Sequence, residues 1–341
     1  MDPSARNSKT KSRPPMPAEP DRRILITGGA GFLGVNAAIH LVKEGWNATV
    51  LDNLSRPGTE RNLKWLLTRY PNRITFVKED LRNAAALPEH VRDQDAILHL
   101  AGQVAVTTSL ADPNTDFDVN ARGTLNMLEA VRLHNHDAPL VFASTNKVYG
   151  KLDHNNGPCG ESQPIDFHSP YGCSKGAADQ YVRDYARCFQ MNTVVLRQSC
   201  IYGSHQYGTE DQGWVAHFVH SILKDRPLTI YGDGTQVRDL LDARDLSALY
   251  ATAIDKIGIT RGEIYNVGGG PENQRNLLEV IDQIGELTGH KPQFTFADWR
   301  EGDQKFYVSD VTKAKRDLGW EPRVAFDRGL RDLISWAESV N

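Results

Sequence analysis

Residues 23–34 read RILITGGAGFLG, a short apolar run followed directly by regularly spaced glycines. The apolar part, residues 23–27, predicts a buried β-strand. Gly28, Gly31 and Gly34 follow it at G-x-x-G-x-x-G spacing, and an apolar pattern of helical period begins among them. A strand, a glycine-rich turn and a helix in this order are typical of a dinucleotide-binding unit.

Each glycine has its own role in such a unit. Gly28 permits the tight turn, Gly31 lets the backbone approach a pyrophosphate, and Gly34 lets the helix pack close to the strand. The predicted helix runs from Phe32 to about Lys43. Free backbone N–H groups and the dipole at its start favour a diphosphate. The alternative interpretation is an ordinary turn before a structural helix.

An acidic residue at the end of the next predicted strand argues for the dinucleotide. Asp52 ends the second predicted strand, which begins at Ala48. It lies about 20 residues beyond the glycine turn, where a carboxylate can bind both ribose hydroxyls of an adenosine. The same carboxylate would repel a 2′-phosphate, so we expect NAD rather than NADP. Arg56 argues against this expectation, because its guanidinium can pair with a 2′-phosphate. We expect Arg56 to stack on adenine instead.

Composition excludes several classes of protein. The 341-residue chain has a net charge of −4 and 24% charged residues, so it offers no dense basic face for nucleic acid or a membrane surface. Its length allows two lobes, and no apolar run approaches a transmembrane helix. The cysteines lack metal-ligand spacing and indicate a reducing cytoplasm, so we expect no bound metal. The oligomeric state stays open, a homo-oligomer included.

The first residues differ from the rest of the chain. Residues 1–22 contain several prolines and basic residues, with Met16 as their sizeable apolar group. Such a segment cannot bury enough surface to fold, and it has no apolar core for a signal peptide. We therefore predict a disordered tail.

From Arg23 onward, strand and helix patterns alternate. This alternation predicts an α/β protein with a Rossmann-type, doubly wound parallel sheet. Ligands of such sheets bind outside the carboxyl ends of the strands. The predicted strands lie near 23–27, 48–52, 73–78, 95–100, 139–144 and 193–197, with long helices near 114–134 and 170–190.

Polar and small residues follow two of these strands. Asp80, followed by Leu81, can accept from an adenine amino group, and the small residues of 100–103 would let a dinucleotide pass. Asn120 falls inside a predicted helix, where a buried amide must be paired. The alternative for Asn120 is a polar residue that kinks the helix.

A candidate catalytic group follows the fifth strand. Pro170 suits the first turn of a helix, which places Tyr171 and Lys175 at i, i+4 on one face. A nearby ammonium and a cationic nicotinamide favour the phenolate form that a tyrosine base requires. Thr145, at the strand end, can hydrogen-bond the same substrate hydroxyl. An ordinary amphipathic helix is the alternative, and the combination with Thr145 and the glycine turn argues against it.

Two arginines mark the last third of the chain. Residues 230–239 predict a turn-rich hairpin that carries Arg238, and Arg300 follows a short strand. Arginines on loops suit bidentate binding of a second diphosphate. Solvated surface arginines are the alternative. A helix is also expected over residues 211–224.

Together these residues resemble the extended short-chain dehydrogenase/reductase family of NAD-dependent nucleotide-sugar epimerases and dehydratases, from Arg23 to about Val340. The resemblance implies a catalytic triad of Thr145, Tyr171 and Lys175. It implies a tail at 1–22, a mainly NAD-binding domain at 23–192, and a mainly nucleotide-sugar-binding lobe at 193–341 with segments that return to the sheet. The implied NAD site comprises Gly28, Gly31, Phe32, Leu33, Gly34, Asp52, Asn53, Ser55, Arg56, Asp80, Leu81, Leu100, Ala101, Gln103, Asn120, Tyr171 and Lys175. The implied substrate site comprises Lys147, Cys200, Gln206, Arg238 and Arg300.

Four stretches resemble one branch of this family, the CDP-paratose (CDP-tyvelose) 2-epimerases. They are DNLSR at 52–56, STNKVYG at 144–150, DFHSPYGCSKG at 166–176 and DQGWV at 211–215. The branch implies inversion at C2 of a CDP-linked deoxyhexose with tightly held NAD. The chain departs from the branch at Cys200, where Ser is expected, and at His205, where Arg is expected.

The residues after Thr145 discriminate between reactions. A 4,6-dehydratase needs an acid and a base there, whereas Asn146 cannot titrate and Lys147 is normally cationic. An epimerase needs one base, a bound nicotinamide and room for the ketone to present both faces. Lys147 would then bind a sugar hydroxyl or a phosphate, unless it is a surface lysine. A UDP-hexose 4-epimerase and a non-catalytic NAD-binding protein remain the alternatives.

Overall fold

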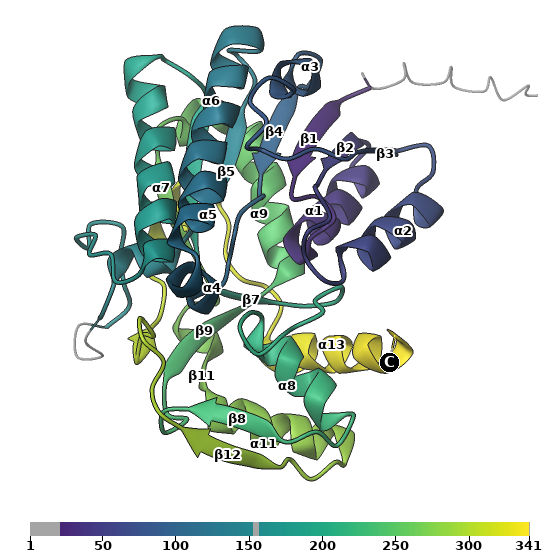
Figure 1. Ribbon diagram of the computed structural model, residues 1–341, viewed down its shortest axis with the longest axis vertical. Helices are drawn as coiled ribbons and strands as arrows, with labels where there is room; N and C mark the ends of the chain where they lie inside the picture. Colours follow the sequence, from purple (N-terminus) through teal and green to yellow (C-terminus); the bar gives the residue numbers. More distant parts are fainter. Residues whose placement is uncertain (1–20, 153–156, 341) are drawn as a thin grey trace, which may run out of the picture.

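The computed structural model describes residues 21–152 and 157–340. The tail expected at residues 1–22 therefore falls outside the described residues, except for its last two positions. The described chain forms two lobes, with the two long-helix layers and the main sheet in one and a smaller group of strands and helices in the other (Figure 1).

The main sheet has seven strands in the order β10-β6-β5-β4-β1-β2-β3, and neighbouring strands run parallel. The predicted α/β, doubly wound fold is confirmed, and both ends of each predicted strand lie within one residue of the observed end. A seventh strand from the last third, β10, joins the edge beside β6. The strands are β1 (Arg23–Thr27), β2 (Asn47–Leu51), β3 (Ile74–Val77), β4 (Ala96–His99), β5 (Leu140–Thr145), β6 (Thr193–Gln198) and β10 (Ile264–Val267).

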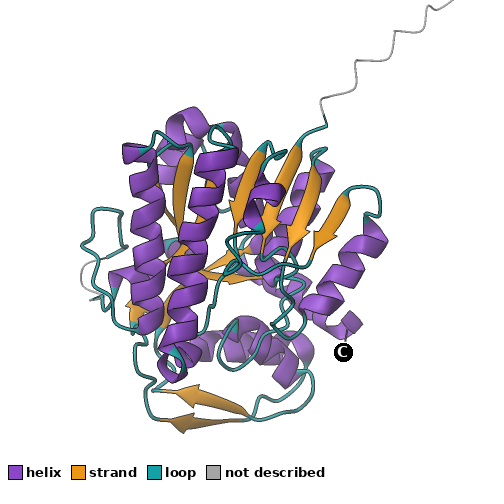
Figure 2. Ribbon diagram, turned by 45° about the horizontal axis from the view of Figure 1, so that its top comes forward, coloured by secondary structure: helices purple, strands orange, loops and turns teal. Residues whose placement is uncertain are grey.

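Helices cover both faces of this sheet (Figure 2). One face packs on α1 (Phe32–Lys43), α2 (Thr59–Arg69) and α9 (Ala243–Asp255), and the other on α3 (Leu87–Val91), α6 (Gly123–His134) and α7 (Pro170–Cys188). Each face has its own apolar core, because the strands are buried on both sides. Shorter helices are α4 (Val106–Ala111), α5 (Pro113–Phe117), α10 (Ile257–Thr260) and α12 (Thr312–Leu318).

The helix predicted over 114–134 is interrupted. A π-helical turn, Asp118–Arg122, separates α5 from α6. Asn120 lies in this turn, and its side chain donates to Asp116 on α5 and to Ser174 on α7. A single wider turn of this kind occurs often at functional sites, and here it aims the amide at the end of β4.

The second lobe contains two small sheets. In one, β9 (Val237–Asp242) pairs with β7 (Cys200–Tyr202), β11 (Gln274–Asn276) and β13 (Phe306–Tyr307); in the other, β8 (Leu228–Tyr231) pairs with β12 (Phe294–Ala297). The helices α8 (Trp214–Ile222), α11 (Leu277–Thr288) and α13 (Phe326–Val340) pack on them around a third apolar core.

The predicted hairpin at 230–239 is wrong. The turn exists, with Gly232 and Gly234 at φ of 86° and 79°, but β8 and β9 pair with different partners. β12 runs parallel to β8, so the partner of β8 comes from a distant part of the chain. Likewise, the helix expected from residue 211 begins at Trp214, because Gly213 at φ 75° precedes it in the left-handed region.

Candidate active site

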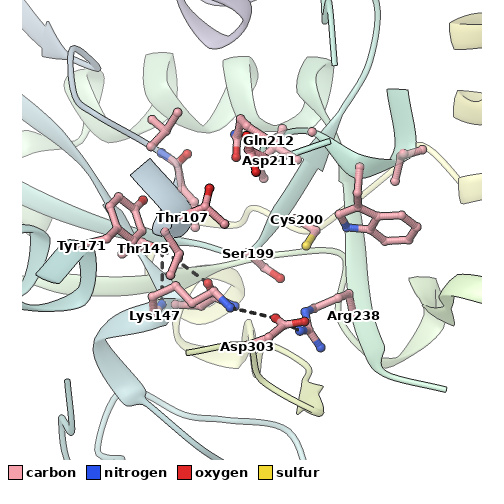
Figure 3. A pocket seen from close by; sticks show the side chains of 18 of the residues that line it. Thr107, Thr145, Lys147, Tyr171, Ser199, Cys200, Asp211, Gln212, Arg238 and Asp303 are labelled. Carbon is pink, nitrogen blue, oxygen red and sulfur yellow. Dashed lines mark hydrogen bonds and ion pairs between the residues drawn. The ribbon is translucent and has the colours of Figure 1, made fainter. Parts of the chain in front are cut away.

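A cavity of about 320 Å³ lies between the carboxyl ends of the main sheet and the second lobe (Figure 3). It brings together residues that are far apart in the sequence: the start of α1, the ends of β4 and β5, the first turns of α7, and loops of the second lobe. Of the predicted site residues, those that line it are Phe32, Leu33, Leu100, Thr145, Lys147, Tyr171, Lys175, Cys200, Gln206, Arg238 and Arg300.

The glycine turn is packed tightly against its neighbours. Gly28 has φ 65° and donates from its backbone N to the Leu51 carbonyl over 2.8 Å. A Cβ on Gly28 would stand 2.8 Å from the Ala101 backbone, and one on Gly34 would stand 2.4 Å from the Gly28 carbonyl. Only glycines therefore allow this close approach of α1, β1 and β4.

Asp52 joins the glycine turn to the following loop. Its Oδ2 accepts from the Ala30 backbone N at 3.1 Å, and its Oδ1 accepts from Leu54 N at 2.8 Å. Burial raises the pKa of Asp52, and these backbone donors oppose that shift. The buried carboxylate, the glycine cradle and the open start of α1 fit an adenine dinucleotide with its diphosphate over the turn.

A second carboxylate organises the adenosine end. Asp80 receives a two-point bond from Arg82, Nε to Oδ1 at 2.9 Å and Nη2 to Oδ2 at 2.8 Å, and a further bond from Asn53. The hydrogen bonds from Arg82 hold the pKa of Asp80 well below its usual range. Ser55 donates its backbone N to Asn53 Oδ1 at 3.0 Å. Asp80 is thus ionised and paired, and its partner Arg82 is a residue that no sequence motif singled out.

Asn120 is fully paired. Its Oδ1 accepts from Gln103 N at 2.9 Å, and its Nδ2 donates to Asp116 Oδ1 at 3.1 Å and to Ser174 Oγ at 3.0 Å. The amide therefore ties the loop after β4 to helix α7. A Cβ at Gly102 would meet Asn120 Oδ1 at 2.9 Å, so the loop passes close over the amide.

The start of α7 fixes Tyr171. Ser169 caps the helix by accepting from Gly172 N at 3.0 Å, and Tyr171 N donates to Ser109 Oγ at 3.1 Å. The Tyr171 side chain lies beside Thr145 at the cavity wall (Figure 3). Burial raises the pKa of Tyr171 to about 12, while a hydrogen bond with Thr145 and the charge of Arg56 act in the opposite direction.

Lys175 lies one turn further along α7. Its Nζ donates to the Ala143 carbonyl over 2.6 Å and sits 4.2 Å from the centroid of the Phe142 ring. Burial lowers the pKa of Lys175 to about 7, against the opposing charges of Asp179 and Asp116. The sequence predicts a lysine ammonium as a group that favours the phenolate, and Lys175 stands one turn from Tyr171 on α7. The charge of Arg56, from the loop after Asp52, also lowers the Tyr171 pKa.

A buried ion pair supports this face of α7. Asp179 accepts two bonds from Arg197, each 2.9 Å long, and a third from Ser144 Oγ at 2.7 Å. Arg197 also donates to Tyr149 Oη at 2.9 Å. The sequence carries one signal for this pair: Asp179 follows Tyr171 and Lys175 at the same i+4 interval.

Lys147 and Arg238 meet at one carboxylate. Asp303 Oδ1 accepts from Lys147 Nζ at 3.3 Å and from Arg238 Nη2 at 2.9 Å. Burial lowers the pKa of Lys147, and Arg238 lowers it further. Cys200 faces the two cations from β7, and burial raises the pKa of its thiol. Lys147 is therefore not a surface lysine.

Arg300 has a separate carboxylate partner. Its Nη2 lies 2.9 Å from Glu210 Oε1, and its guanidinium stacks 3.7 Å from the centroid of the Tyr231 ring. Two buried oxygens that line the cavity, Gln206 Oε1 and Gln236 Oε1, have no hydrogen-bond partner among the described residues. These acceptors fit a ligand with polar hydrogens.

Within 21–152 and 157–340, no group of three or more histidine, cysteine, aspartate or glutamate residues is placed to hold a metal ion. No helix in these ranges is both long and apolar enough to cross a membrane.

The comparisons with known proteins decide the family. Residues 25–333 match the family model described as GDP-mannose 4,6 dehydratase. The chain belongs to the NAD-dependent nucleotide-sugar epimerase/dehydratase family of extended short-chain dehydrogenases/reductases. The family resemblance predicted from the sequence is thereby confirmed, and so is membership of an enzyme family.

Three relatives indicate the range of reactions. The CDP-paratose 2-epimerase of Salmonella typhi is 42% identical over 93% of this chain and 100% of that protein. The crystal structure of Thermus thermophilus UDP-glucose 4-epimerase in complex with NAD is 33% identical, with a TM-score of 0.84 over 94% of this chain and 100% of that one. DesIV, a dTDP-glucose 4,6-dehydratase from Streptomyces venezuelae with NAD and TYD bound, is 30% identical, with a TM-score of 0.84 over 93% and 97%.

Proposed function

We propose that this protein is an NAD-dependent epimerase that inverts C2 of a CDP-linked hexose. The observation that carries the proposal is the pair of side chains after Thr145. Asn146 is buried and donates to Gln304 Oε1 at 3.4 Å, and Lys147 is held by Asp303. A 4,6-dehydratase needs a base to remove a C5 proton and an acid to protonate a leaving hydroxyl. Asn146 and Lys147 do not supply this pair. One tyrosine base suffices for an epimerase.

The chain's own groups have defined roles in this reaction. Tyr171 takes the proton of the sugar hydroxyl and returns it, and Thr145 donates to the same oxygen. Lys175 stands one turn behind Tyr171 and, when protonated, stabilises the phenolate. NAD would supply the chemistry of reversible oxidation at the carbon, and Gly28, Gly34 and Asp52 are the residues that would hold it.

The choice of C2 and of cytidine rests on similarity. The 2-epimerase of Salmonella typhi matches nearly the whole chain at 42% identity, and two of the four branch-like stretches contain Thr145 and Tyr171. The second candidate is a UDP-hexose 4-epimerase, which the Thermus thermophilus structure favours. Both candidates use the same base and the same cofactor.

Turnover separates these candidates. The purified protein is incubated with a panel of CDP-, UDP-, GDP- and dTDP-hexoses, and NMR of the product locates the inverted carbon. We expect inversion at C2 of a CDP-sugar. Inversion at C4 of a UDP-sugar would support the second candidate, and no turnover of any sugar would support a non-catalytic NAD-binding protein.

The nucleotide released from the denatured protein is expected to be NAD. Asp52 lies where a 2′-phosphate would approach a buried carboxylate, and like charges at that distance repel strongly in a partly buried site. Mass spectrometry of the released nucleotide measures this directly. A release of mostly NADP would show that Arg56 pairs with the phosphate and would contradict the prediction.

Hydrogen at the inverted carbon is expected to stay with the sugar. No second acid–base pair follows Thr145, so the carbon has no route for exchange with water. Product formed in heavy water should carry no deuterium at C2, and substrate deuterated at C2 should keep its label. NAD is not consumed, so the absorbance of reduced nicotinamide should rise only to a small steady level. Solvent deuterium at C2 would mean deprotonation beside a carbonyl instead.

A further inference from the structure

We propose that Lys147 binds the β-phosphate of the nucleotide sugar and thereby brings C2, rather than C4, to Tyr171. This inference rests on the proposed function and names what would select the reacting carbon. It starts from the position of Lys147, whose backbone N donates to Thr145 Oγ1 at 3.2 Å while its Nζ reaches Asp303. The side chain thus spans from the reacting centre to the predicted diphosphate site (Figure 3).

The two cations are already arranged for one anion. Lys147 Nζ and Arg238 Nη2 donate to the same oxygen, Asp303 Oδ1, over 3.3 Å and 2.9 Å. A phosphate carries several anionic oxygens, so one phosphate can accept from both donors. Lys147, Arg238 and Asp303 together carry a net positive charge, because two cations face one carboxylate. The thiol of Cys200 beside them is neutral, since burial raises its pKa.

The covalent structure of the substrate links this site to the carbon that reacts. C2 is bonded to C1, the carbon that carries the diphosphate, whereas C4 lies across the ring. An enzyme that acts on C2 must therefore hold the β-phosphate close to its tyrosine. Lys147 provides a cation within one side-chain length of Thr145, at the position where dehydratases of the family place a carboxylate.

Nucleotide affinities test the contact. Calorimetry on the NAD-loaded protein compares the affinity for CMP with that for CDP, and the affinity for UMP with that for UDP. Within each pair the two nucleotides differ only in the β-phosphate, so the comparison holds whichever base the pocket prefers. In Lys147→Met the dissociation constant of the diphosphate should rise about 10- to 100-fold, the usual weight of a charge-assisted hydrogen bond. The monophosphate constant should change less than about 3-fold, since its phosphate lies beyond this contact.

Three further variants secure the result. Lys147→Gln keeps a donor toward Asp303 and should lose the same diphosphate preference, even if the methionine variant folds poorly. Lys147→Arg keeps the cation and should retain the preference. Lys64→Met removes an exposed lysine of α2 and should change neither constant.

The outcomes also separate this inference from the proposed function. An equal loss for mono- and diphosphates, no loss in Lys147→Met, or no wild-type preference for diphosphates would overturn the phosphate contact. A loss seen only with the complete nucleotide sugar would place the ammonium on a sugar hydroxyl, which also overturns it. A diphosphate-specific loss in a protein that inverts C4 would leave the contact standing and overturn the assignment to C2.

Discussion

Tyr171→Phe is expected to lower turnover by about 10²- to 10⁴-fold, the usual weight of one general base. Only the phenolic oxygen is lost, and the ring keeps its buried place at the start of α7, so NAD content and folding should stay near normal. The reason for the large loss is that the described residues place no second titratable group in hydrogen-bond contact with Thr145 Oγ1. The measurement is the initial rate with the active nucleotide sugar, with NAD content by mass spectrometry alongside.

Tyr181→Phe is the matched control. It removes the same atom from the same helix, but Tyr181 is 48% exposed and lies away from the cavity. Its turnover should match that of the unaltered protein. Activity of Tyr171→Phe within a few-fold of that value would place the base on another residue and contradict the assigned triad.

Features set by local spacing were predictable from the sequence. Gly28 and Gly34 follow a strand at fixed intervals, and the structure shows the close contacts that these intervals imply. Tyr171 and Lys175 share a helix face because they are one turn apart, and Pro170 marks where that helix begins. In each case the residues that set the pattern lie within a few positions of one another in the chain.

The contacts that the sequence did not reveal join distant segments. Asp303 and Glu210 hold the two predicted substrate arginines, and nothing near Arg238 or Arg300 in the sequence identifies them as partners. The same reason explains the wrong hairpin, since the turn after β8 was visible but its parallel partner β12 was not. The charge of Arg56, which lowers the Tyr171 pKa, also comes from another part of the chain.

Arg197→Met is expected to lower the free energy of unfolding by about 3–5 kcal/mol, the usual cost of leaving one partner of a buried ion pair alone. The Arg197 and Asp179 side chains are only 3% and 0% exposed. Removal of the guanidinium leaves the Asp179 carboxylate buried without its cation, and Tyr149 loses a hydrogen-bond donor. Asp179 also faces Lys175, so the disturbance reaches the catalytic face of α7. Urea denaturation of the NAD-loaded protein measures the change.

A comparison with a surface pair shows that burial, not charge alone, sets this cost. Lys315 pairs with Glu321, and their side chains are 64% and 50% exposed, so Lys315→Met should cost at most about 1 kcal/mol. The double variant Arg197→Met with Asp179→Leu should be less destabilised than Arg197→Met alone, because it leaves no unpaired buried charge. If Arg197→Met unfolded within about 1 kcal/mol of the unaltered protein, the buried pair would not be what holds this face of α7 against β5 and β6.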